Sequence, residues 1–598
     1  MPIRENSEVA AIFHEMADML DISGNNPFRI RAFHRAAQSI ENLPESAGQM
    51  LEKGTLARVP GIGAGILGRV KQILETGDCE DHAELRKEVG DGLLEMMKIE
   101  GIGPKTVKLI FTELGIQSVD ALEAAAQQGH LARLPRMGEK SQAKILDAIA
   151  AYRRHSGRIL LGEALPEGMA IVEALRENPV VERIDLAGSS RRRQETIGDL
   201  DVLVASTDVK QVMDHFVSLP QVHNVMLRGD TKCSVHLRRG MQVDLRVVRP
   251  ESFGAALHYF TGSKMHNIAV RDRGKRRGLK INEYGIYREG GEQSIGGRTE
   301  GEIFASVGLP YIPPELRENQ GEIEAAEADQ LPHLIEESDL RGDLHCHTDF
   351  TDGTASVLEM AEAAAALGFD YLAITDHSRS LTVARGLDLA RLAEQGKVVR
   401  EVEQELGEIA LLTGIEVDIL PDGELDLPPD VLHELQWVVA SVHSHFNLSA
   451  EDQTARVIRA MESGVVDCIG HPSGRLLGQR DGYPIDMDRV IQTAARLGVA
   501  LELNAFPDRL DLDPPHCRQA REMGVPVVIN TDSHAPAHLA QRAFGIYTAR
   551  RGWLEPKDVL NTRSVEQIRA WRAQRLPPSP SGKTKKPSSP AASRRRKR

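Results

Sequence analysis

The last part of the chain repeats one pattern that few folds can accommodate: a short apolar segment, a residue able to bind a metal, and a stretch of helical character. Between residues 339 and 571, apolar segments fall at 371–375, 410–412, 437–441, 499–503 and 527–530. Alternation of short strands with helices is typical of the units that build a parallel sheet. We therefore predict a parallel, barrel-like sheet in this region.

Histidine, aspartate and glutamate residues follow these predicted strands. One strand begins Asp343-Leu344-His345-Cys346-His347, and another is followed by Thr531-Asp532-Ser533-His534. Because the carboxyl ends of parallel strands open at one mouth of a barrel, we expect these side chains to gather there. Imidazole with carboxylate suits Zn²⁺, Mn²⁺ or Fe²⁺ rather than Ca²⁺. The predicted metal ligands are His345, His347, Asp352, His377, Glu416, His443, His471, Asp532 and His534.

Two simpler explanations compete with a metal cluster. A single His after a strand is more often a hydrogen-bonded structural residue than a ligand, and a site for one ion is simpler than a site for several. Repetition of the pattern at six successive strand ends argues against the first explanation. Nine candidate ligands are too many for one ion, so the pattern favours a multinuclear centre.

Charge is divided unevenly along the 598 residues, whose net charge is −14. Residues 1–310 carry 41 Lys and Arg against 42 Asp and Glu, whereas the remainder carries 32 against 45. The net charge of the whole chain argues against a nucleic-acid partner, but a nearly neutral first half can carry basic patches. Residues 576–598 are rich in Pro, Ser, Lys and Arg and are expected to form a disordered basic tail, either merely solvated or adding nonspecific DNA affinity.

Two segments near the N-terminus share a Gly-apolar-Gly pattern, whose glycines are Gly61, Gly63, Gly101 and Gly103; a degenerate third copy lies at 134–141. Such a turn at the start of a helix directs free N–H groups outward and suits a phosphate. A lone copy is more often an ordinary turn, but duplication with Lys105 nearby favours binding. The pattern resembles helix-hairpin-helix modules, which hold the DNA backbone without reading its sequence.

The middle region holds a second group of carboxylates on predicted strands. Asp199 and Asp201 lie two residues apart and so face one side, and Asp244 lies on another strand. Three converging carboxylates can hold two Mg²⁺ ions that activate a hydroxyl and stabilise a pyrophosphate leaving group. Asp-x-Asp alone is often only a polar strand face. The upstream Ser189 and Arg192, which can bind triphosphate oxygens, make the pattern more specific.

With these motifs, residues 5–312 resemble the family X DNA polymerases. The matching motifs are Gly188-Ser189, Gly198-Asp199-Leu200-Asp201, Tyr259-Phe260-Thr261-Gly262-Ser263 and Ile281-Asn282-Glu283-Tyr284. The resemblance implies that Asp199, Asp201 and Asp244 are the catalytic ligands of Mg²⁺ or Mn²⁺. It also implies that Arg271 contacts the template strand, that Tyr259 helps to reject ribonucleotides, and that the nucleotide is bound by Ser189, Arg192, Gly198, Tyr259, Phe260, Gly262 and Asn267.

Two departures from that family's pattern stand out. Ser190 and Arg193 replace the aromatic residue and the glycine that are usual in the Gly-Ser motif. Arg69 occupies the position of the Lys that forms a Schiff base in relatives with 5′-deoxyribose-phosphate lyase activity, and Lys71, two residues along a helix, points elsewhere. A guanidinium stays protonated and cannot attack an aldehyde, so we do not expect lyase activity.

The C-terminal region resembles the polymerase and histidinol phosphatase (PHP) metal hydrolases, with every ligand position filled. By that resemblance three ions would be bound: one by His345, His347, Glu416 and Asp532, one by Glu416, His443 and His471, and one by Asp352, His377 and His534. His445 and Arg475 are candidates for binding a substrate phosphate. Such ions generate hydroxide near neutral pH and neutralise the phosphate under attack.

The whole chain up to its basic tail resembles the bacterial family X polymerases with a C-terminal PHP domain. The implied fold is multidomain: α-helical helix-hairpin-helix domains, an α+β nucleotidyltransferase palm and thumb, and a distorted (β/α)7-type barrel. The predicted parts are an N-terminal helical domain (1–80), a second helix-hairpin-helix region (81–154), a palm (155–250), a nucleotide-selection subdomain (251–312), a linker (313–338), a PHP domain (339–575) and the tail (576–598).

We expect an enzyme of DNA repair that fills short gaps with deoxynucleoside triphosphates and trims 3′ ends at the PHP site, the 3′–5′ direction being implied by the resemblance. Two alternatives stay open: a PHP half that is mainly a 3′-phosphatase or other phosphoesterase, and a DNA-end binding protein without catalysis. Five scattered cysteines, and the lack of a signal peptide or a membrane-length apolar run, predict a cytoplasmic monomer without a membrane partner.

Overall fold

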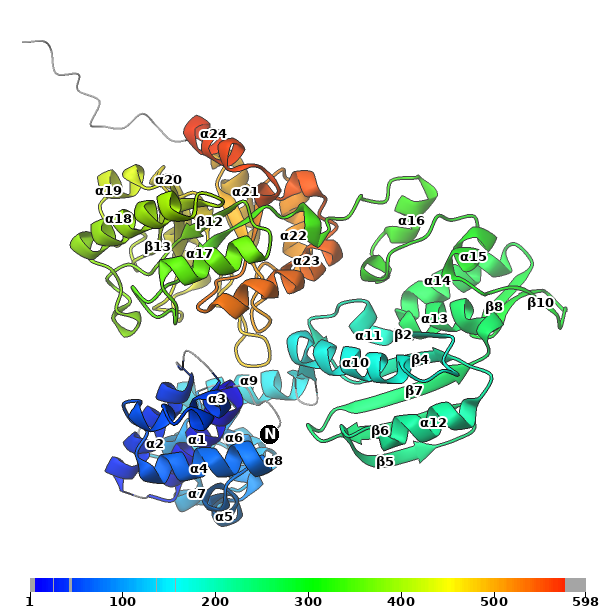
Figure 1. The fold of residues 1–598 in the computed structure, drawn as a ribbon, viewed down its shortest axis with the longest axis horizontal. Coiled ribbons are helices and arrows are strands. Elements are labelled where there is room, and N and C mark those ends of the chain that lie inside the picture. The colour runs from blue at the N-terminus through cyan, green and yellow to red at the C-terminus, as the bar shows by residue number, and fades with distance from the viewer. Residues whose placement is uncertain are drawn as a thin grey trace, which may run out of the picture.

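The computed structural model describes residues 6–24, 26–41, 43, 46–99, 101–135, 137–155 and 158–575. The predicted basic tail, 576–598, lies outside these residues. Figure 1 shows a helical N-terminal region, a central region with a mixed sheet, and a C-terminal region built around a second sheet. Among the described residues, no helix is both long and apolar enough to cross a membrane.

The N-terminal region is entirely helical and has two hydrophobic cores. The first core unites buried residues between Val9 and Leu94, and the second unites Ile22 with residues from Leu93 to Ile149. The helices are α1 (Asn6–Ile22), α2 (Pro27–Glu41), α3 (Ala47–Glu52), α4 (Ala64–Thr76), α5 (Glu80–Val89), α6 (Asp91–Met97), α7 (Pro104–Leu114), α8 (Val119–Gln127) and α9 (Glu139–His155).

Both predicted Gly-apolar-Gly segments form turns that open a helix. Gly61 and Gly101 have φ of 94° and 78°, a left-handed conformation that favours glycine. Gly63 and Gly103 are the N-caps of α4 and α7. The apolar residue between each pair of glycines is buried while the glycines themselves are exposed, so the core anchors each turn and leaves its backbone facing outward.

The central region contains a five-stranded sheet in the order β2-β4-β7-β6-β5, in which β4 and β7 run parallel and the other neighbours antiparallel. A short pair, β1 and β3, lies outside it. The elements are β1 (Ile159–Leu160), α10 (Leu161–Arg176), β2 (Arg183–Leu186), α11 (Gly188–Arg191), β3 (Thr196–Ile197), β4 (Leu200–Ala205), α12 (Val209–Ser218), β5 (Val222–Arg228), β6 (Lys232–Leu237) and β7 (Gln242–Val248).

A smaller α+β unit follows the five-stranded sheet. It comprises α13 (Phe253–Thr261), α14 (Lys264–Lys275), the strands β8 (Leu279–Asn282), β9 (Gly285–Arg288) and β10 (Ser294–Gly296), and α15 (Glu300–Ser306). At its centre Glu300 pairs with Arg191 at 2.6 Å and with Arg317 at 2.5 Å. Arg317 is fully buried, so this charged network is part of the core.

The segment 313–338, predicted to be a linker, is packed against the folded regions on either side. It contains α16 (Glu322–Glu327), and buried Leu316, Ile323 and Leu334 share a core with the preceding unit and with Trp553 of the C-terminal region. Buried Glu322 accepts a hydrogen bond from His266 at 2.7 Å. The segment connects the two regions as predicted by its position, but apolar side chains along it pack into a core that both regions share.

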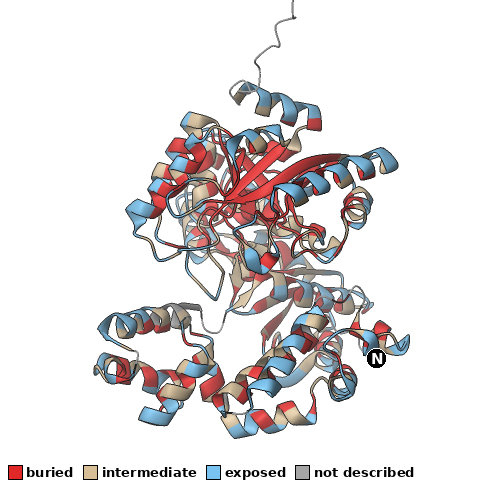
Figure 2. Ribbon diagram, turned by 90° about the vertical axis from the view of Figure 1, so that its left-hand side faces the viewer, coloured by how far each residue is buried: buried red, intermediate tan, exposed pale blue. Residues whose placement is uncertain are grey.

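The C-terminal region is the predicted parallel sheet, with seven strands in sequence order from β11 to β17. A bridge between Cys346 and Ser533 brings the first and last strands together, so the barrel is nearly closed. The strands are β11 (Gly342–Cys346), β12 (Tyr371–Ile374), β13 (Ala410–Asp418), β14 (Trp437–Ser441), β15 (Cys468–Ile469), β16 (Ala500–Asn504) and β17 (Val527–Asn530). Figure 2 shows these strands buried at the centre of the region.

Helices cover the outside of the barrel, as strands buried on both faces require. They are α17 (Val357–Ala366), α18 (Leu389–Leu406), α19 (Pro429–Glu434), α20 (Ala450–Glu462), α21 (Met487–Leu497), α22 (Pro514–Glu522), α23 (Arg542–Arg551) and α24 (Val565–Arg575). The predicted α-helical, α+β and (β/α)7-type regions are thus confirmed in order. One detail differs: β13 extends to Asp418, so Glu416 lies within a strand and not after it.

Candidate functional site

The three carboxylates of the central sheet converge as predicted. Asp201 on β4 is the direct ladder partner of Asp244 on β7, and Asp199 precedes β4 by one residue. One oxygen from each of the three lies within 4.8 Å of the others. Parallel pairing explains this convergence, because ladder partners on neighbouring strands project to the same face of a sheet.

The negative charges of the three carboxylates lie close enough to repel one another, and closely spaced negative charges of this kind bind cations. Burial and the charges of Asp199 and Asp244 raise the pKa of Asp201 to about 7. Burial also raises the pKa of Asp244, but the hydrogen bond and charge of Lys232, at 2.5 Å, together with hydrogen bonds from Gln242 and Ser234, outweigh burial and leave that pKa lowered. Negative charge held this closely fits a pair of divalent cations.

A cleft of about 480 Å³ opens beside these carboxylates. Arg271 lies at the same cleft, and Asn267 is fixed there because its Nδ2 donates to the carbonyl of Tyr259 at 2.7 Å. Gly198 and Asp244 are the predicted residues of this site that do not line it. The lining comprises Gly188, Ser189, Arg192, Asp199, Asp201, Tyr259, Phe260, Thr261, Gly262, Lys264, Asn267 and Arg271.

Arg192 is already engaged by the protein. Its Nε donates to Glu318 at 2.8 Å, and its Nη1 donates to the carbonyl of Thr261. Glu318 also accepts a hydrogen bond from Gln194. Sequence reasoning missed Glu318, because it lies in the segment taken for a linker and nothing local signals its contact with Arg192.

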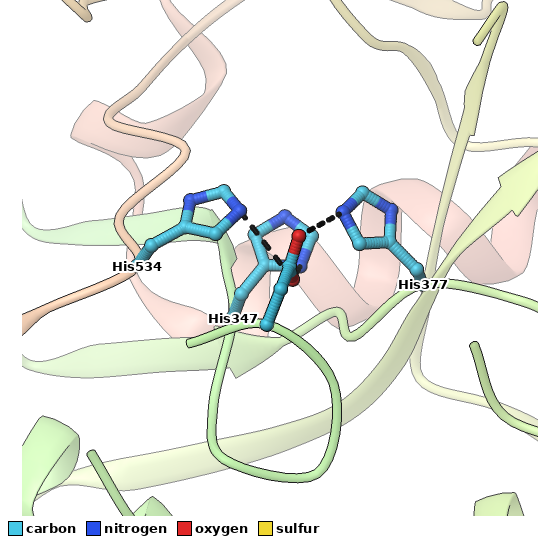
Figure 3. Close-up of side chains that lie close together, drawn as sticks. His347, His377 and His534 are labelled. Atoms are coloured by element: carbon cyan, nitrogen blue, oxygen red, sulfur yellow. Dashed lines mark ion pairs between the residues drawn. The ribbon is translucent and has the colours of Figure 1, made fainter. Parts of the chain in front are cut away.

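The nine predicted ligands of the barrel also come together. Glu416 is their centre: it lies between 2.7 and 3.6 Å from ring nitrogens of five histidines, His345, His347, His377, His443 and His471. Asp532 lies 3.0 Å from Nε2 of His347. Asp352 lies 3.4 Å from His377 and 3.5 Å from His534, and Figure 3 shows the rings of His347, His377 and His534 turned toward one another.

Several of these groups lack the partners that buried polar atoms normally have. Nε2 of His345, both ring nitrogens of His347 and Oε2 of Glu416 are buried without a hydrogen bond among the described residues. Such atoms are costly to bury unless something else binds them. The backbones of Asp532 and His471 have positive φ, at 51° and 28°, a strain that is concentrated at functional sites. These features fit divalent metal ions with nitrogen and oxygen ligands.

The pKa of His347 is shifted in the opposite direction from the pKa values of His377 and His443. Burial, with His534 and His377 nearby, lowers the pKa of His347 to about 3. Burial opposes protonation of His377 and His443 as well, but Glu416, with Asp352 or Asp418, raises their pKa values to about 10 and about 9. The carboxylates therefore attract positive charge into a buried site, and a bound cation would supply that charge.

Behind the ligands lies a layer of carboxylates that sequence reasoning missed. Glu502 lies 2.7 Å from Nδ1 of His345 and accepts the backbone N–H of His471 at 2.6 Å. Asp418 contacts Nδ1 of His443 at 2.5 Å. Partners of this kind orient histidine ligands and select the ring nitrogen that faces a metal. The available signal was a charged residue inside an apolar strand, as in Ala500-Leu501-Glu502-Leu503.

The two candidate phosphate-binding residues of the barrel have different surroundings. The guanidinium of Arg475 is engaged by Glu195 of the central region and by the carbonyls of Arg509 and Leu510. His445 is exposed on the loop after β14 and not on a strand. Arg509, which was not predicted, has its Nε 3.8 Å from Oδ2 of Asp532 and is the better-placed cation.

Arg69 forms a structural ion pair. Its Nε donates to Asp81 at 2.8 Å, its Nη1 donates to the carbonyl of Gly65 at 2.7 Å, and its guanidinium lies over the ring of Phe33. Lys71, two residues along α4, pairs with Glu75 at 3.9 Å. These contacts agree with the expectation that Arg69 is not a nucleophile.

Comparison with protein families matches four parts of the chain: a helix-hairpin-helix domain at 4–79, a SAM-like helix-hairpin-helix tandem at 93–151, a DNA polymerase beta thumb at 256–318 and a PHP domain at 343–505. The chain is 40% identical over 567 residues to the DNA polymerase/3′-5′ exonuclease PolX of Bacillus subtilis, which covers 94% of this chain and 98% of that protein.

Other relatives match a shorter part of the chain. A probable phosphatase of Thermoanaerobacter sp. is 28% identical over 232 residues, covering 37% of this chain and 89% of that protein. A probable phosphatase of Acetivibrio thermocellus is 31% identical over 202 residues, covering 32% of this chain and 78% of that protein.

Proposed function

Because this chain belongs to the bacterial family X DNA polymerases that carry a C-terminal PHP domain, we propose that Asp199, Asp201 and Asp244 form its polymerase centre and that the barrel cluster is its 3′–5′ exonuclease centre. The observation that carries this division is the convergence of three carboxylates beside the cleft that Ser189 and Arg192 line. The central sheet with the following α+β unit thus forms the palm and thumb of the polymerase.

At the polymerase centre the residues have distinct proposed roles. Asp199, Asp201 and Asp244 would hold Mg²⁺ or Mn²⁺, which when bound activate the primer hydroxyl and stabilise the leaving pyrophosphate. Ser189 and Arg192 bind triphosphate oxygens. Arg192 must release Glu318 before it can bind the nucleotide. Tyr259, held by Asn267, borders the sugar and disfavours a ribonucleotide.

At the barrel centre the nine residues around Glu416 would hold divalent ions, for which Mn²⁺, Zn²⁺ and Fe²⁺ suit the ligands. Ions bound there supply a hydroxide nucleophile near neutral pH and neutralise the phosphodiester. We propose three ions: one at His345, His347, Glu416 and Asp532, one at Glu416, His443 and His471, and one at Asp352, His377 and His534. Their grouping is supported by the contacts of Glu416, Asp352 and Asp532.

The substrate proposed for both centres is gapped or primer-template DNA bound without sequence preference. Support comes from the two exposed turns at Gly61–Gly63 and Gly101–Gly103, which present backbone N–H groups beside Lys105. We propose further that the protein acts in DNA repair as a cytoplasmic monomer.

Substituting one centre at a time tests this division. The double variant Asp199→Ala, Asp201→Ala should slow primer extension by roughly a hundredfold or more, because ions bound there would lower the activation barrier by several kcal/mol. It should leave exonuclease activity intact. His347→Ala should remove exonuclease activity and leave primer extension intact. Asp230→Asn, at an exposed turn of the same sheet, is the control. Joint loss of both activities in a folded variant would contradict two separate centres.

A second candidate activity of the barrel is removal of 3′-phosphates, favoured by the two probable phosphatases that match about a third of this chain. Two primers that differ only at the 3′ end distinguish the activities. A nuclease shortens a primer with a 3′-hydroxyl, whereas a phosphomonoesterase acts only on the primer with a 3′-phosphate.

Purified protein with Mn²⁺ that neither extends nor shortens any primer would instead favour a non-catalytic DNA-end binding protein.

A further inference from the structure

A bidentate ion pair joins the barrel to the palm at the Gly-Ser motif. Nη2 of Arg475 lies 2.6 Å from Oε1 of Glu195, and Nη1 lies 3.3 Å from Oε2. The two side chains are 15% and 20% exposed, so water screens the pair only partly. Paired guanidinium and carboxylate groups of this geometry fix orientation as well as distance.

On the barrel side, Arg475 is held rigidly. Its Nε donates to the carbonyl of Arg509 at 3.0 Å and its Nη2 donates to that of Leu510. Four residues earlier in the chain is His471, which contacts Glu416 in the metal cluster. Arg475 is therefore a fixed point of the barrel.

On the palm side, Glu195 closes the turn that carries the triphosphate-binding residues. The turn is tight, because the backbone N–H of Gln194 donates to the carbonyl of Ser189 at 3.0 Å. After Glu195 the chain pairs with β1 and continues to Asp199. Movement of Glu195 would consequently displace Ser189 and Arg192 together.

The same turn has two more contacts with the barrel region, both from α23. The guanidinium of Arg193 lies 4.4 Å from the ring centre of Tyr547, and Nη2 of Arg551 donates to Gln194 at 3.0 Å. Three consecutive residues of the palm, 193–195, thus rest on the other catalytic domain. Arg193 has a φ of 56°, a conformation that a non-glycine residue keeps only when its surroundings hold it.

We propose that Arg475 is a positioning residue for the polymerase reaction: through Glu195 it holds the Ser189–Arg192 turn in the conformation that binds the nucleotide triphosphate. This inference rests on the proposed roles of Ser189 and Arg192. It assigns to the nuclease domain a direct part in nucleotide affinity. Arg475 is remote from the chemical step, so its loss should weaken nucleotide binding and leave the rate of bond formation nearly unchanged.

Single-turnover incorporation of one deoxynucleotide into gapped DNA by the full-length protein tests the proposal, because it measures nucleotide dissociation constant and maximal rate separately. The key variant is Arg475→Lys, which keeps the charge but loses the two-point contact. A roughly tenfold rise in the dissociation constant with a rate within twofold of wild type is expected. Glu195→Gln should give the same change, although it removes a negative charge that repels the triphosphate.

Separate measurement of nucleotide affinity and maximal rate distinguishes this role from a merely structural one, because loss of folded protein lowers the number of active molecules and not the affinity of those that remain. The matched control is Arg489→Gln, which breaks an exposed ion pair with Glu451 on the same domain. Exonuclease activity and thermal unfolding of each preparation report folding. Wild-type affinity in both Arg475→Lys and Glu195→Gln, or a fall in rate at unchanged affinity, would overturn the proposal.

Arg192→Gln separates this proposal from the one on which it rests. If Arg192→Gln weakens nucleotide binding while Arg475→Lys and Glu195→Gln do not, only the positioning role fails. If Arg192→Gln also leaves nucleotide affinity unchanged, the proposed triphosphate site is wrong and the positioning role falls with it.

Discussion

Asp201 and Asp244 are ladder partners on the neighbouring parallel strands β4 and β7, so their carboxylates face the same side of the palm at one level of the sheet. Burial and this proximity raise the pKa of Asp201 to about 7. The pairing of the two strands therefore holds two mutually repelling carboxylates side by side next to the cleft. Only the folded sheet keeps them this close, and bound divalent cations would relieve their repulsion.

Glu502 should be needed by the nuclease although it is not one of the nine ligands. It holds His345 and the backbone of His471, so Glu502→Gln should lower exonuclease activity and bound metal by about 10- to 100-fold, as loss of such partners usually does. Primer extension should be unchanged. Elemental analysis and a primer-degradation assay measure the effect, with exposed Glu451→Gln as control; full metal content in Glu502→Gln would contradict it.

Arg509 should bind the scissile phosphate or its neighbour at the barrel centre. Its guanidinium lies beside Asp532 and is 24% exposed, so it can reach a substrate anion. Arg509→Ala should reduce kcat/KM of the exonuclease by roughly tenfold and Arg509→Lys by less, because charge without the planar fork retains part of the contact. Arg496→Ala, which removes an exposed arginine of α21, should have no effect. Equal activity of Arg509→Ala and wild type would exclude the role.

Lys105 should contribute to DNA affinity through the phosphate backbone. It is exposed in the first turn of α7, directly after Gly103 and Pro104. Lys105→Ala should weaken binding to gapped DNA of any sequence and reduce the slope of log affinity against log salt by about 1. Fluorescence anisotropy across a salt series measures both values. Lys397→Ala, on a barrel helix, serves as control; an unchanged slope in Lys105→Ala would mean that this turn does not contact phosphate.

Glu300 should make the stability of the thumb depend on pH. Burial raises its pKa, but Arg191 and Arg317 outweigh burial and lower the pKa to about 2 from 4.5. A carboxylate with a lowered pKa stabilises the fold above pH 4.5, and that stabilisation is lost as the pH falls toward 2. Glu300→Gln should therefore destabilise the thumb by up to about 3 kcal/mol at pH 7 and by progressively less at lower pH.

Hydrogen exchange of amides in residues 256–318, followed between pH 7 and pH 3 with correction for intrinsic exchange, measures this difference for the thumb alone. Glu327→Gln breaks the exposed pair with Arg273 and should leave exchange unchanged. A penalty for Glu300→Gln that stays constant across this pH range would show that the lost hydrogen bonds, and not the charge, account for it.

Much of the fold was predictable from local pattern. The strands at 242–248, 437–441 and 527–530 have the predicted bounds, because short apolar segments between polar turns bury well as strands inside a sheet. The nine candidate barrel ligands and the three palm carboxylates that the structure brings together were also readable, since most of them lie on or close to such a strand and their residue types limit their chemistry. Composition alone did not reveal that Leu316 and Leu334, in the segment predicted to be a linker, share one core with Trp553 of the C-terminal region.

What the sequence determined by itself is therefore which histidine and acidic residues come together in the barrel, and the kind of ions that such residues suit. The tertiary structure decided how those residues are supported and connected. Glu416 becomes the centre of five histidines because β13 runs past it, and Glu502 supports His345 from a strand far along the chain. Arg475 pairs with Glu195 because the palm lies against the barrel there. Contacts between residues so distant in sequence depend on the packing of whole domains, which no local pattern encodes.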